Sequence, residues 1–314
     1  MATIIINNNI KNYVVMNELE ETELIQMNEN KTNINYYPGH MAKTRRLISE
    51  KFNLIDIVYE VIDSRIPRSS KIKDIDDLIK DKPRILIMTK YDLCDKKITD
   101  KWIEYYKKMG YYIISLDLTK NGSTTKLVDL THKIMEELQQ KRIDKGLAKK
   151  DIRALVIGVP NVGKSTLINR LANKKVAVTG NNPGVTKNIS WLKTNSNILL
   201  MDSPGILWPK LDDQEQALNL ASFTSIPIDI LPKDKVAIYI LNTLYKYYPE
   251  ILKNRYNIDY IDNDDISNTY DLIGKKIGAI ISKGEIDYDR VSRTILEDIK
   301  QENIKGITFD RGID

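Results

Sequence analysis

The nine residues GVPNVGKST, Gly158–Thr166, have the composition and spacing of a phosphate-binding loop. They follow an apolar, strand-like run and lead into a helix-like one, TLINRLANKK. Glycines allow backbone N–H groups to wrap around phosphates, a lysine in this position reaches the β- and γ-phosphates, and the serine after it ligates Mg²⁺. The start of the helix adds a partial positive charge. The loop therefore predicts a nucleoside-triphosphate site, with contacts from Asn161, Val162, Gly163, Lys164, Ser165 and Thr166.

A second signal is DSPG, Asp202–Gly205, which ends another apolar run further along the chain. An acidic residue in this position holds Mg²⁺ through water, and the glycine N–H senses the γ-phosphate. Between the two motifs, NNPGVTKN contains Thr186, whose hydroxyl could complete the metal shell or belong to an ordinary loop. The expected Mg²⁺ ligands are Ser165, Thr186 and Asp202, the last through water, and Gly205 is an expected nucleotide contact.

The quartet TKYD, Thr89–Asp92, ends the apolar run RILIMT and has the features of a guanine-recognition element. Its aspartate can accept hydrogen bonds from guanine N1–H and N2–H₂, and its lysine stem can cover the purine face. ATP would leave that carboxylate unpaired, which disfavours an ATPase such as a P-loop motor or kinase. The next strand-like run ends in SLDL, which is expected to supply backbone contacts to the base. The expected base-site residues are Thr89, Lys90, Asp92, Asp117 and Leu118.

The guanine element comes before the phosphate loop, whereas ordinary GTP-binding proteins have the opposite order. Nucleotide binding depends on where the strand ends meet in space, so a sheet cut at one loop and rejoined through its former termini keeps the same site. The order therefore indicates a circular permutation. The chain then runs from DSPG directly into the C-terminal segment, and we expect the nucleotide state to be transmitted there.

Apolar, partly β-branched runs alternate with helix-periodic stretches from residue 53 onward. The runs are IDIVYEVID, RILIMTK, YYIISL, RALVIG, ISWLKT and NILLMD. This alternation predicts an α/β fold with a mostly parallel sheet and helices on both faces. After Pro209, apolar residues recur every three or four positions, which predicts an all-helical domain. The expected domains are a mobile extension over residues 1–33, a circularly permuted P-loop GTPase domain over 34–210 and a helical domain over 211–314.

Composition narrows the possible classes of protein. The 314 residues contain one cysteine, Cys94, and two histidines, which excludes a disulfide framework and a Cys- or His-rich metal site. No apolar run approaches the length of a membrane span. The N-terminal segment lacks the apolar core of a signal peptide and the arginines of a transit peptide. We therefore expect a cytoplasmic protein with no membrane partner.

Basic residues are concentrated in the middle of the chain. Residues 34–213 carry 33 Lys and Arg against 21 Asp and Glu, while both flanking segments are net acidic. Clusters such as Lys43/Arg45/Arg46 suit a polyanion through counterion release, or they are simply solvated helix faces. Together with the nucleotide motifs the distribution favours RNA as a partner. The acidic helical segment fits direct RNA binding less well.

With these residues in view, the sequence resembles the circularly permuted GTPases that assemble ribosomes, most closely bacterial ribosome biogenesis GTPase A. The resemblance covers about residues 34–314 and rests on YPGHMAK, DIVYEVIDSRIPRSS, KPRI, GVPNVGKSTLINRLA, NNPGVT, DSPGILWPK and YDR…ILEDI. Three features depart from the family pattern. Thr89 stands where asparagine is usual, Asp117 and Leu118 replace a more typical Asn-Ser pair, and the N-terminal extension has no counterpart.

The resemblance implies a Mg²⁺-dependent GTPase that acts in late assembly of the large ribosomal subunit, is stimulated by that subunit, and contacts rRNA and ribosomal proteins. We expect a monomer. Ile206 follows DSPG, where a Ras-like protein carries the glutamine that orients water. The resemblance implies that His40 takes this catalytic role; alternatively, His40 lies in an arm that binds RNA or packs on the core.

The resemblance also implies that Asn161 helps to bind K⁺, although Asn161 could equally fix the loop. The alternative function is a GTP-binding switch with negligible turnover that acts on a non-ribosomal partner.

Overall fold

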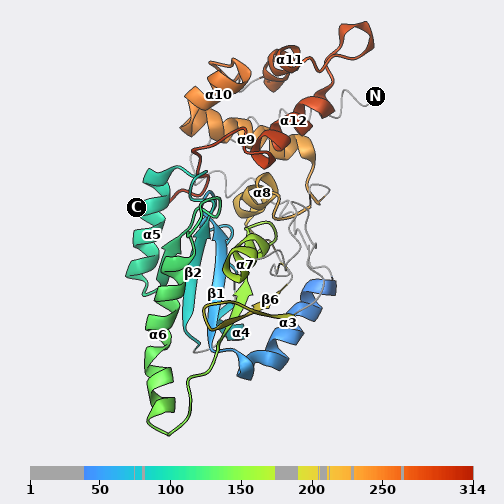
Figure 1. Cartoon of the computed structure of the whole chain (residues 1–314). Coiled ribbons are helices and arrows are strands. Elements are labelled where there is room, and N and C mark those ends of the chain that lie inside the picture. Colours follow the sequence, from blue (N-terminus) through green and yellow to red (C-terminus); the bar gives the residue numbers. More distant parts are fainter. Residues whose placement is uncertain are drawn as a thin grey trace. The chain divides into compact units, whose positions relative to one another are not determined.

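Figure 1 shows the structure, a computed structural model that describes residues 39–73, 75–79, 82–173, 190–203, 205, 211, 213–227, 230–262 and 265–313. The described chain forms two compact units. The first, here called the α/β unit, contains residues 34–230 together with 305–314, and the second, the helical unit, contains residues 231–304. The sequence placed this boundary after residue 210. The difference arises because α8 (Gln214–Ser222) and the C-terminal tail pack with the α/β unit.

A six-stranded sheet forms the centre of the α/β unit, in the order β3-β2-β1-β4-β6-β5. The strands are β1 (Ile57–Asp63), β2 (Arg84–Thr89), β3 (Tyr112–Ser115), β4 (Ile152–Ile157), β5 (Ser190–Lys193) and β6 (Ile198–Asp202). Every neighbouring pair is parallel except the β5–β6 pair at one edge. The predicted α/β fold with a mostly parallel sheet is confirmed.

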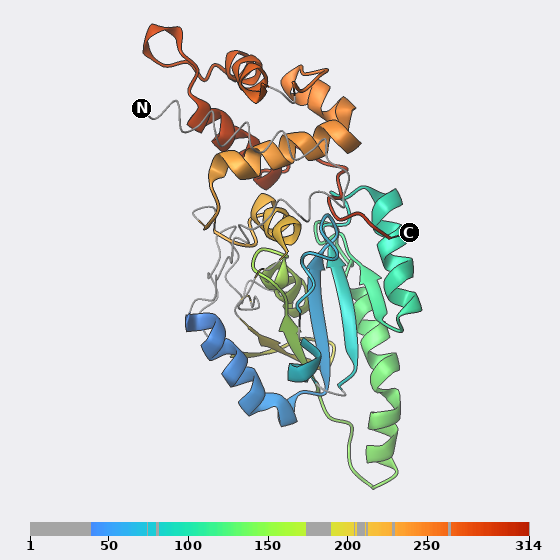
Figure 2. The same cartoon turned by 180° about the vertical axis from the view of Figure 1, so that it is seen from behind.

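The central strands are apolar on both faces because helices cover both sides of the sheet. All seven residues of β1 are buried. Two of them are carboxylates, Glu60 and Asp63. Glu60 accepts a hydrogen bond from the Ile72 N–H (3.0 Å) and pairs with Arg84 (3.2 Å), as a buried carboxylate must. Helices α6 (Thr125–Ile143) and α7 (Lys164–Ala172) lie over one face, and α4 (Ile75–Ile79) and α5 (Lys96–Lys108) over the other, as Figures 1 and 2 show.

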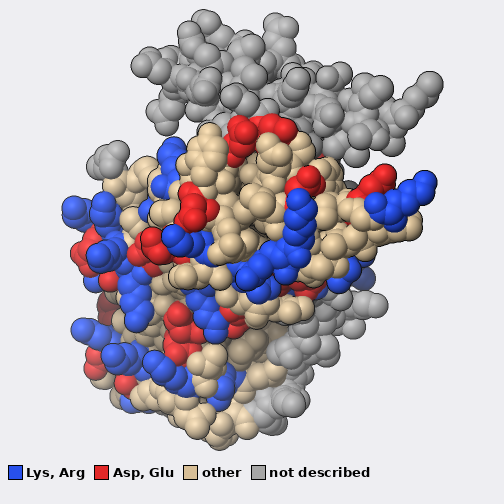
Figure 3. All heavy atoms as spheres, turned by 90° about the horizontal axis from the view of Figure 1, so that it is seen from above, with Lys and Arg blue, Asp and Glu red and all other residues tan. Residues whose placement is uncertain are grey.

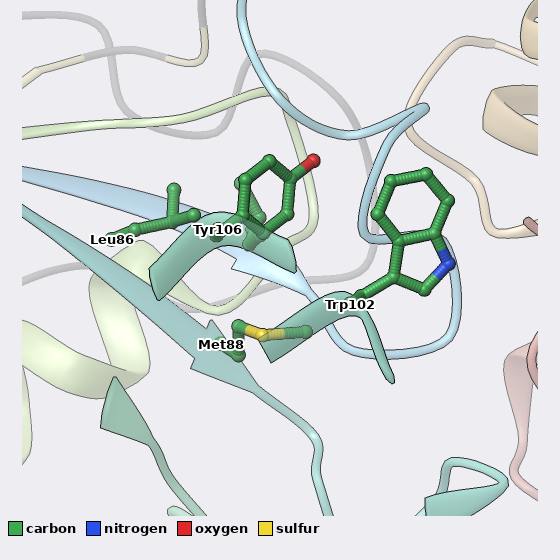
Figure 4. Close-up of a cluster of buried hydrophobic side chains, with 5 residues drawn as sticks. Leu86, Met88, Trp102 and Tyr106 are labelled. Atoms are coloured by element: carbon green, nitrogen blue, oxygen red, sulfur yellow. The ribbon is translucent and has the colours of Figure 1, made fainter. Parts of the chain in front are cut away.

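Helix α5 packs through an aromatic face. Trp102 and Tyr106 lie one turn apart on this helix and are buried against Ile62, Leu86 and Met88 of β1 and β2 (Figure 4). On the opposite face, the Tyr59 hydroxyl of β1 lies 2.6 Å from the Thr131 hydroxyl of α6. Helix α3 (Gly39–Lys51) packs near α4.

The strand order reverses between β1 and β4, and the carboxyl ends of the parallel strands β3, β2, β1, β4 and β6 lie along the same edge of the sheet. Asp63 at the end of β1 is in register with Thr89 at the end of β2, and Val156 of β4 is in register with Asp202 of β6. In open parallel sheets, ligands bind in the crevice outside such a reversal. The permuted chain therefore still has a single switch point at which its motifs converge.

The tail after residue 304 returns to the α/β unit and pairs with loops at the carboxyl end of the sheet. The Gly306 N–H donates to the Leu93 carbonyl and the Phe309 N–H to the Arg65 carbonyl, both at 2.8 Å. The Phe309 ring meets Phe223 edge-on, with centroids 5.0 Å apart. No motif in the sequence indicated this return.

The helical unit contains α9 (Lys233–Tyr247), α10 (Pro249–Tyr256), α11 (Ile266–Ile277) and α12 (Tyr288–Lys300), so the predicted helical C-terminal region is confirmed. Its core includes the fully buried Ile240, Ile273 and Ile295. Asp298 is buried and accepts hydrogen bonds from Arg255 and the Tyr256 hydroxyl.

On the face drawn in Figure 3, basic and acidic side chains are interspersed. None of the helices in the described ranges is both long enough and apolar enough to cross a membrane.

Candidate guanine-nucleotide site

The phosphate loop connects the buried strand β4 to α7, as the sequence predicted. Gly158 passes so close to β1 that a Cβ atom there would lie 2.4 Å from the Val61 carbonyl oxygen. Gly163 has φ +95°, in the left-handed region that favours glycine, and it immediately precedes Lys164. Both glycines are therefore required by geometry. Asn161, between them, also has a positive φ of 62°.

The side chains of Lys164 and Asp202 are both buried in this site. The Lys164 Nζ donates to the Val159 carbonyl at 2.8 Å, and burial lowers the pKa of Lys164 to about 8 although Asp202 opposes the shift. Burial raises the pKa of Asp202 to about 6, with Lys164 opposing. Burial thus disfavours the charged form of both side chains, a pattern that marks candidate functional sites.

The structure fits the expected magnesium site. The buried Oδ1 atom of Asp202 has no hydrogen-bond partner among the described residues, so a cation or its water would satisfy it. Ser165 lies at the start of α7, half-buried, on the loop that leads to the phosphates. A Cβ atom on Gly205 would lie 2.8 Å from the Pro160 nitrogen, so Gly205 approaches the phosphate loop at backbone distance. Thr186 lies outside the described residues.

The guanine element, at the end of β2, lies against the phosphate loop. The buried Thr89 hydroxyl lies 2.5 Å from the Val162 carbonyl of the phosphate loop and 3.1 Å from the Ile62 carbonyl of β1. Thr89 therefore links the two motifs directly even though it stands in the position of the usual asparagine. Asp92, the residue expected to read guanine, is exposed.

Lys90 is held in place from two sides. Its Nζ donates to Asp63 Oδ2 at 2.9 Å and to the Asn161 carbonyl at 2.7 Å, and its backbone has a positive φ of 58°. Asp63 also accepts both guanidinium bonds of Arg65, at 3.0 and 2.8 Å. These cationic partners hold the pKa of the Asp63 carboxyl well below its usual range despite full burial. The Arg65 guanidinium stacks 4.4 Å from the Phe223 ring centroid, beyond the end of α8.

The predicted base-contact loop after β3 lies against the guanine element. The Leu116 N–H donates to the Met88 carbonyl at 2.7 Å, which aligns the loop with the end of β2. The Leu118 side chain is buried and lies 3.7 Å from the position a Cβ atom of Gly163 would occupy. Asp117 Oδ1 accepts from the Thr119 N–H (2.9 Å) and hydroxyl (2.5 Å), and these bonds lower the pKa of Asp117. The Asp117 carboxylate thus shapes its own loop.

The Asn161 side chain is oriented by a residue that the sequence did not indicate. Its Nδ2 donates to the Thr224 carbonyl at 2.6 Å and lies 3.2 Å from the Thr224 hydroxyl. Because a carbonyl only accepts hydrogen bonds, the amide nitrogen must face Thr224, and Oδ1 faces the other way. His40 lies in the first turn of α3, but its side chain, like Ile206, lies outside what the structure describes.

The structure therefore brings together the three motifs that the sequence separated. Asp63 and Arg65 are site residues that motif spacing did not identify, although an aspartate that ends an apolar strand is the same signal that marked Asp202. Arg170 and Thr224 carried no signal of their own. The Arg170 Nε donates to the Leu118 carbonyl, and the Thr224 carbonyl accepts from the Asn161 side chain, both contacts that only the folded chain brings within reach.

Comparison with known proteins agrees with this arrangement. The family described as 50S ribosome-binding GTPase matches residues 153–262, a stretch that begins at β4 and excludes the guanine element. Ribosome biogenesis GTPase A of Priestia megaterium is 43% identical over 88% of this chain and 96% of its own length, and that of Bacillus cereus is 42% identical over 88% and 93%.

A solved structure of GNP-bound YlqF from T. maritima shares the fold, with a TM-score of 0.60 and 24% identity, and covers 87% of this chain and 99% of its own. At over 40% identity across nearly the full length of its relatives, the chain belongs to the ribosome biogenesis GTPase A family of GTP-hydrolysing proteins.

Proposed function

We propose that this GTPase hydrolyses GTP during late assembly of the large ribosomal subunit and that the subunit stimulates hydrolysis. The names of its relatives and the ribosome-binding description of its matching family support the proposal. The single structural observation that carries the guanine-nucleotide part is the contact of Thr89 with the Val162 carbonyl. It joins the guanine element to the phosphate loop in one site although 73 residues separate them.

The side chains have distinct roles in this site. Asp92 accepts from guanine N1–H and N2–H₂, while Lys90, held by Asp63, covers the base. Lys164 contacts the β- and γ-phosphates. Ser165, Thr186 and Asp202 would hold Mg²⁺, which when bound neutralises charge on the phosphate oxygens. The remaining nucleotide contacts are assigned to Asn161, Val162, Gly163, Thr166, Gly205, Asp117, Leu118 and Thr89.

Water orientation requires a group other than residue 206, because isoleucine has no hydrogen-bonding side chain. We assign that role to His40, whose backbone lies in the first turn of α3. Asn161 is assigned to a K⁺ ion, since its Oδ1 faces away from Thr224 and a carboxamide oxygen suits a hard cation. K⁺ would add positive charge where negative charge develops during phosphoryl transfer.

GTP hydrolysis measured in KCl, with and without purified large ribosomal subunits and with excess ATP as competitor, tests the proposal. We expect strong stimulation by the subunits and no inhibition by ATP. Turnover that stays negligible with subunits and K⁺ would instead favour a GTP-binding switch that acts on a non-ribosomal partner. The observation that favours this second function is that Ile206 has no side-chain group able to orient the attacking water.

The two histidines of the chain provide a matched test of catalysis. His40→Ala should abolish subunit-stimulated turnover while GTP still binds. His132→Ala removes an exposed side chain whose Nε2 lies 3.0 Å from the Ser196 carbonyl, and it should turn over GTP normally. Normal stimulated turnover by His40→Ala would exclude the catalytic assignment.

Replacement of KCl by NaCl tests the K⁺ assignment. It should lower GTP turnover by the parent protein and have little further effect on turnover by Asn161→Ala.

A further inference from the structure

Arg170, in the last turn of α7, makes three hydrogen bonds to the loop that follows β3. Its Nε donates to the Leu118 carbonyl at 2.9 Å, its Nη2 to the Thr119 carbonyl at 3.1 Å, and its Nη1 to Asn121 Oδ1 at 3.1 Å. A guanidinium is a rigid planar group, so three bonds from one side chain fix both the position and the orientation of what they bind.

The loop that Arg170 binds is tied to the end of β2 at its first residue, where the Leu116 N–H donates to the Met88 carbonyl and the Leu116 carbonyl accepts from the Tyr91 N–H. Between the end of β3 and the start of α6, residues 116–124 form no regular element. Leu118 is buried, but Thr119 and Asn121 are exposed. The Asp117 carboxylate bonds within the loop itself, to Thr119, and so shapes the loop without attaching it to the rest of the unit. Arg170 supplies an attachment to a neighbouring helix.

That neighbouring helix begins at Lys164 and Ser165, the residues assigned to the phosphates and Mg²⁺. Arg170 lies six residues after Lys164, which is about 9 Å along a helix at 1.5 Å rise per residue. One short, rigid helix therefore carries the phosphate-binding residues at its start and the side chain that fastens the base-contact loop near its end. Its geometry relates the base end of the nucleotide site to the phosphate end.

We propose that Arg170 is a positioning residue for guanine recognition. It holds the carbonyl groups of Leu118 and Thr119 so that the backbone N–H groups of the same loop point at guanine O6. The inference rests on the assignment of this loop to the base in the proposed function. It predicts a particular pattern of specificity, because O6 is present in guanine and hypoxanthine and is replaced by an amino group in adenine.

Asp92 and the base-contact loop read different atoms, so their contributions can be separated. Hypoxanthine retains O6 and N1–H but lacks the 2-amino group that Asp92 also contacts. Loss of the loop contact should weaken the binding of GDP and of IDP by the same factor, so the ratio of the two affinities should not change. Loss of the Asp92 contact should instead reduce the preference for GDP over IDP. The GDP/IDP ratio thus distinguishes a displaced loop from a damaged carboxylate contact.

The experiment measures equilibrium binding of GDP, IDP and ADP to the full chain carrying Arg170→Ala, Arg170→Lys or Arg142→Ala. Arg142→Ala is the matched control, since it removes an exposed arginine whose Nε donates to the Ala148 carbonyl at the far end of α6. We expect Arg170→Ala to bind GDP and IDP about tenfold more weakly, as loss of about 1.4 kcal/mol implies, with ADP binding unchanged. Arg170→Lys should recover part of the loss, and Arg142→Ala should bind like the parent.

Several outcomes would overturn the inference. Arg170→Ala that binds GDP within twofold of the parent would show that the loop needs no anchor. A changed GDP/IDP ratio, or an equal loss for ADP, would show that the substitution damages the site generally. Failure of the parent protein itself to bind GDP would reject the proposed function, and the role of Arg170 with it.

Discussion

Asp310 accepts hydrogen bonds from both the backbone N–H and the hydroxyl of Ser69, at 2.7 and 2.5 Å, across 241 residues of sequence. The same carboxylate accepts a hydrogen bond from the Asn219 amide of α8 at 2.9 Å. The backbone carbonyl of Asp310 accepts a hydrogen bond from the indole N–H of Trp102 in α5. The tail that leaves the helical unit is therefore anchored to three parts of the α/β unit. The helical unit is joined to the α/β unit by the chain at both of its ends.

Replacement of Asp310 by alanine should lower the free energy of unfolding by about 2 kcal/mol, because buried donors on Ser69 and Asn219 lose their acceptor. Urea unfolding followed by tryptophan fluorescence would measure the change. Asp129→Ala, which removes an exposed carboxylate on α6, is the control and should change the free energy by less than about 0.5 kcal/mol. Equal stability of the two variants would show that the tail is not anchored through Asp310.

Asp310 should also give stability a pH dependence of defined sign. Burial raises the pKa of Asp310 to about 6 from 3.8, although the Ser69 hydrogen bonds oppose the shift. The folded protein therefore holds a proton that the unfolded chain has released between pH 4 and 6. This contribution to stability is fully present below the unfolded pKa and is lost as pH rises through about 6. The asparagine side chain of Asp310→Asn does not titrate in this range, so this variant lacks the pH dependence that Asp310 contributes.

The measurement is urea unfolding of both proteins at steps between pH 4 and 7. The stability of the parent relative to Asp310→Asn should decline over this window, by up to about 3 kcal/mol. Parallel curves for the two proteins would mean that Asp310 titrates alike in the folded and unfolded states.

Thr89→Ala should weaken GDP binding about fivefold to tenfold, because the Val162 carbonyl loses its contact with the guanine element and the two motifs are no longer braced. Isothermal titration with GDP would measure the loss. Thr294→Ala removes a hydroxyl that also bonds a backbone carbonyl, but on α12, and should leave GDP affinity unchanged. Thr89→Asn restores the residue usual in the family. If the alanine variant binds GDP as tightly as the parent, the contact has no role in the site.

Asp63→Asn should destabilise the protein by about 3 kcal/mol, since it leaves the buried Arg65 guanidinium without its anionic partner. The side chains of this pair are only 2% and 4% exposed. Glu50→Gln breaks an exposed ion pair with Arg46 and should cost less than about 1 kcal/mol. Asp63→Asn should also accelerate GDP dissociation, because Lys90 loses the carboxylate that positions it. Stopped-flow release of fluorescent GDP and urea unfolding would test the two effects separately.

Much of the fold could be predicted from sequence because its signals are local. The apolar runs that became β1, β2, β4 and β6 are buried on both faces, which requires continuous hydrophobicity and leaves a readable pattern. Edge strand β5 was also expected as a strand, but its antiparallel direction was not. Direction depends on how the connecting segment crosses the sheet, which short-range periodicity does not encode.

The chemistry of the candidate site was likewise readable, because phosphate binding requires glycines and a lysine at a set spacing, and guanine binding requires a carboxylate after a strand. What sequence reasoning missed are the residues that hold these motifs in position. Asp63, Arg65, Arg170 and Thr224 are ordinary polar residues whose partners are backbone or side-chain groups elsewhere in the α/β unit. Asp63 ends an apolar strand, as Asp202 does, but nothing in the spacing of Arg65, Arg170 and Thr224 distinguishes them from solvated surface residues.

The sequence by itself therefore determined the residue types of a guanine-nucleotide site, its circularly permuted order and the helical character of the C-terminal region, because each depends on neighbours along the chain. Only the tertiary structure decided that Thr89 contacts Val162, that Arg170 fastens the base-contact loop, and that Asp310 returns the tail to Ser69. Those contacts join residues 52 to 241 positions apart. They depend on the order in which strands pair and on the direction in which buried polar groups find partners, and both are properties of the packed chain.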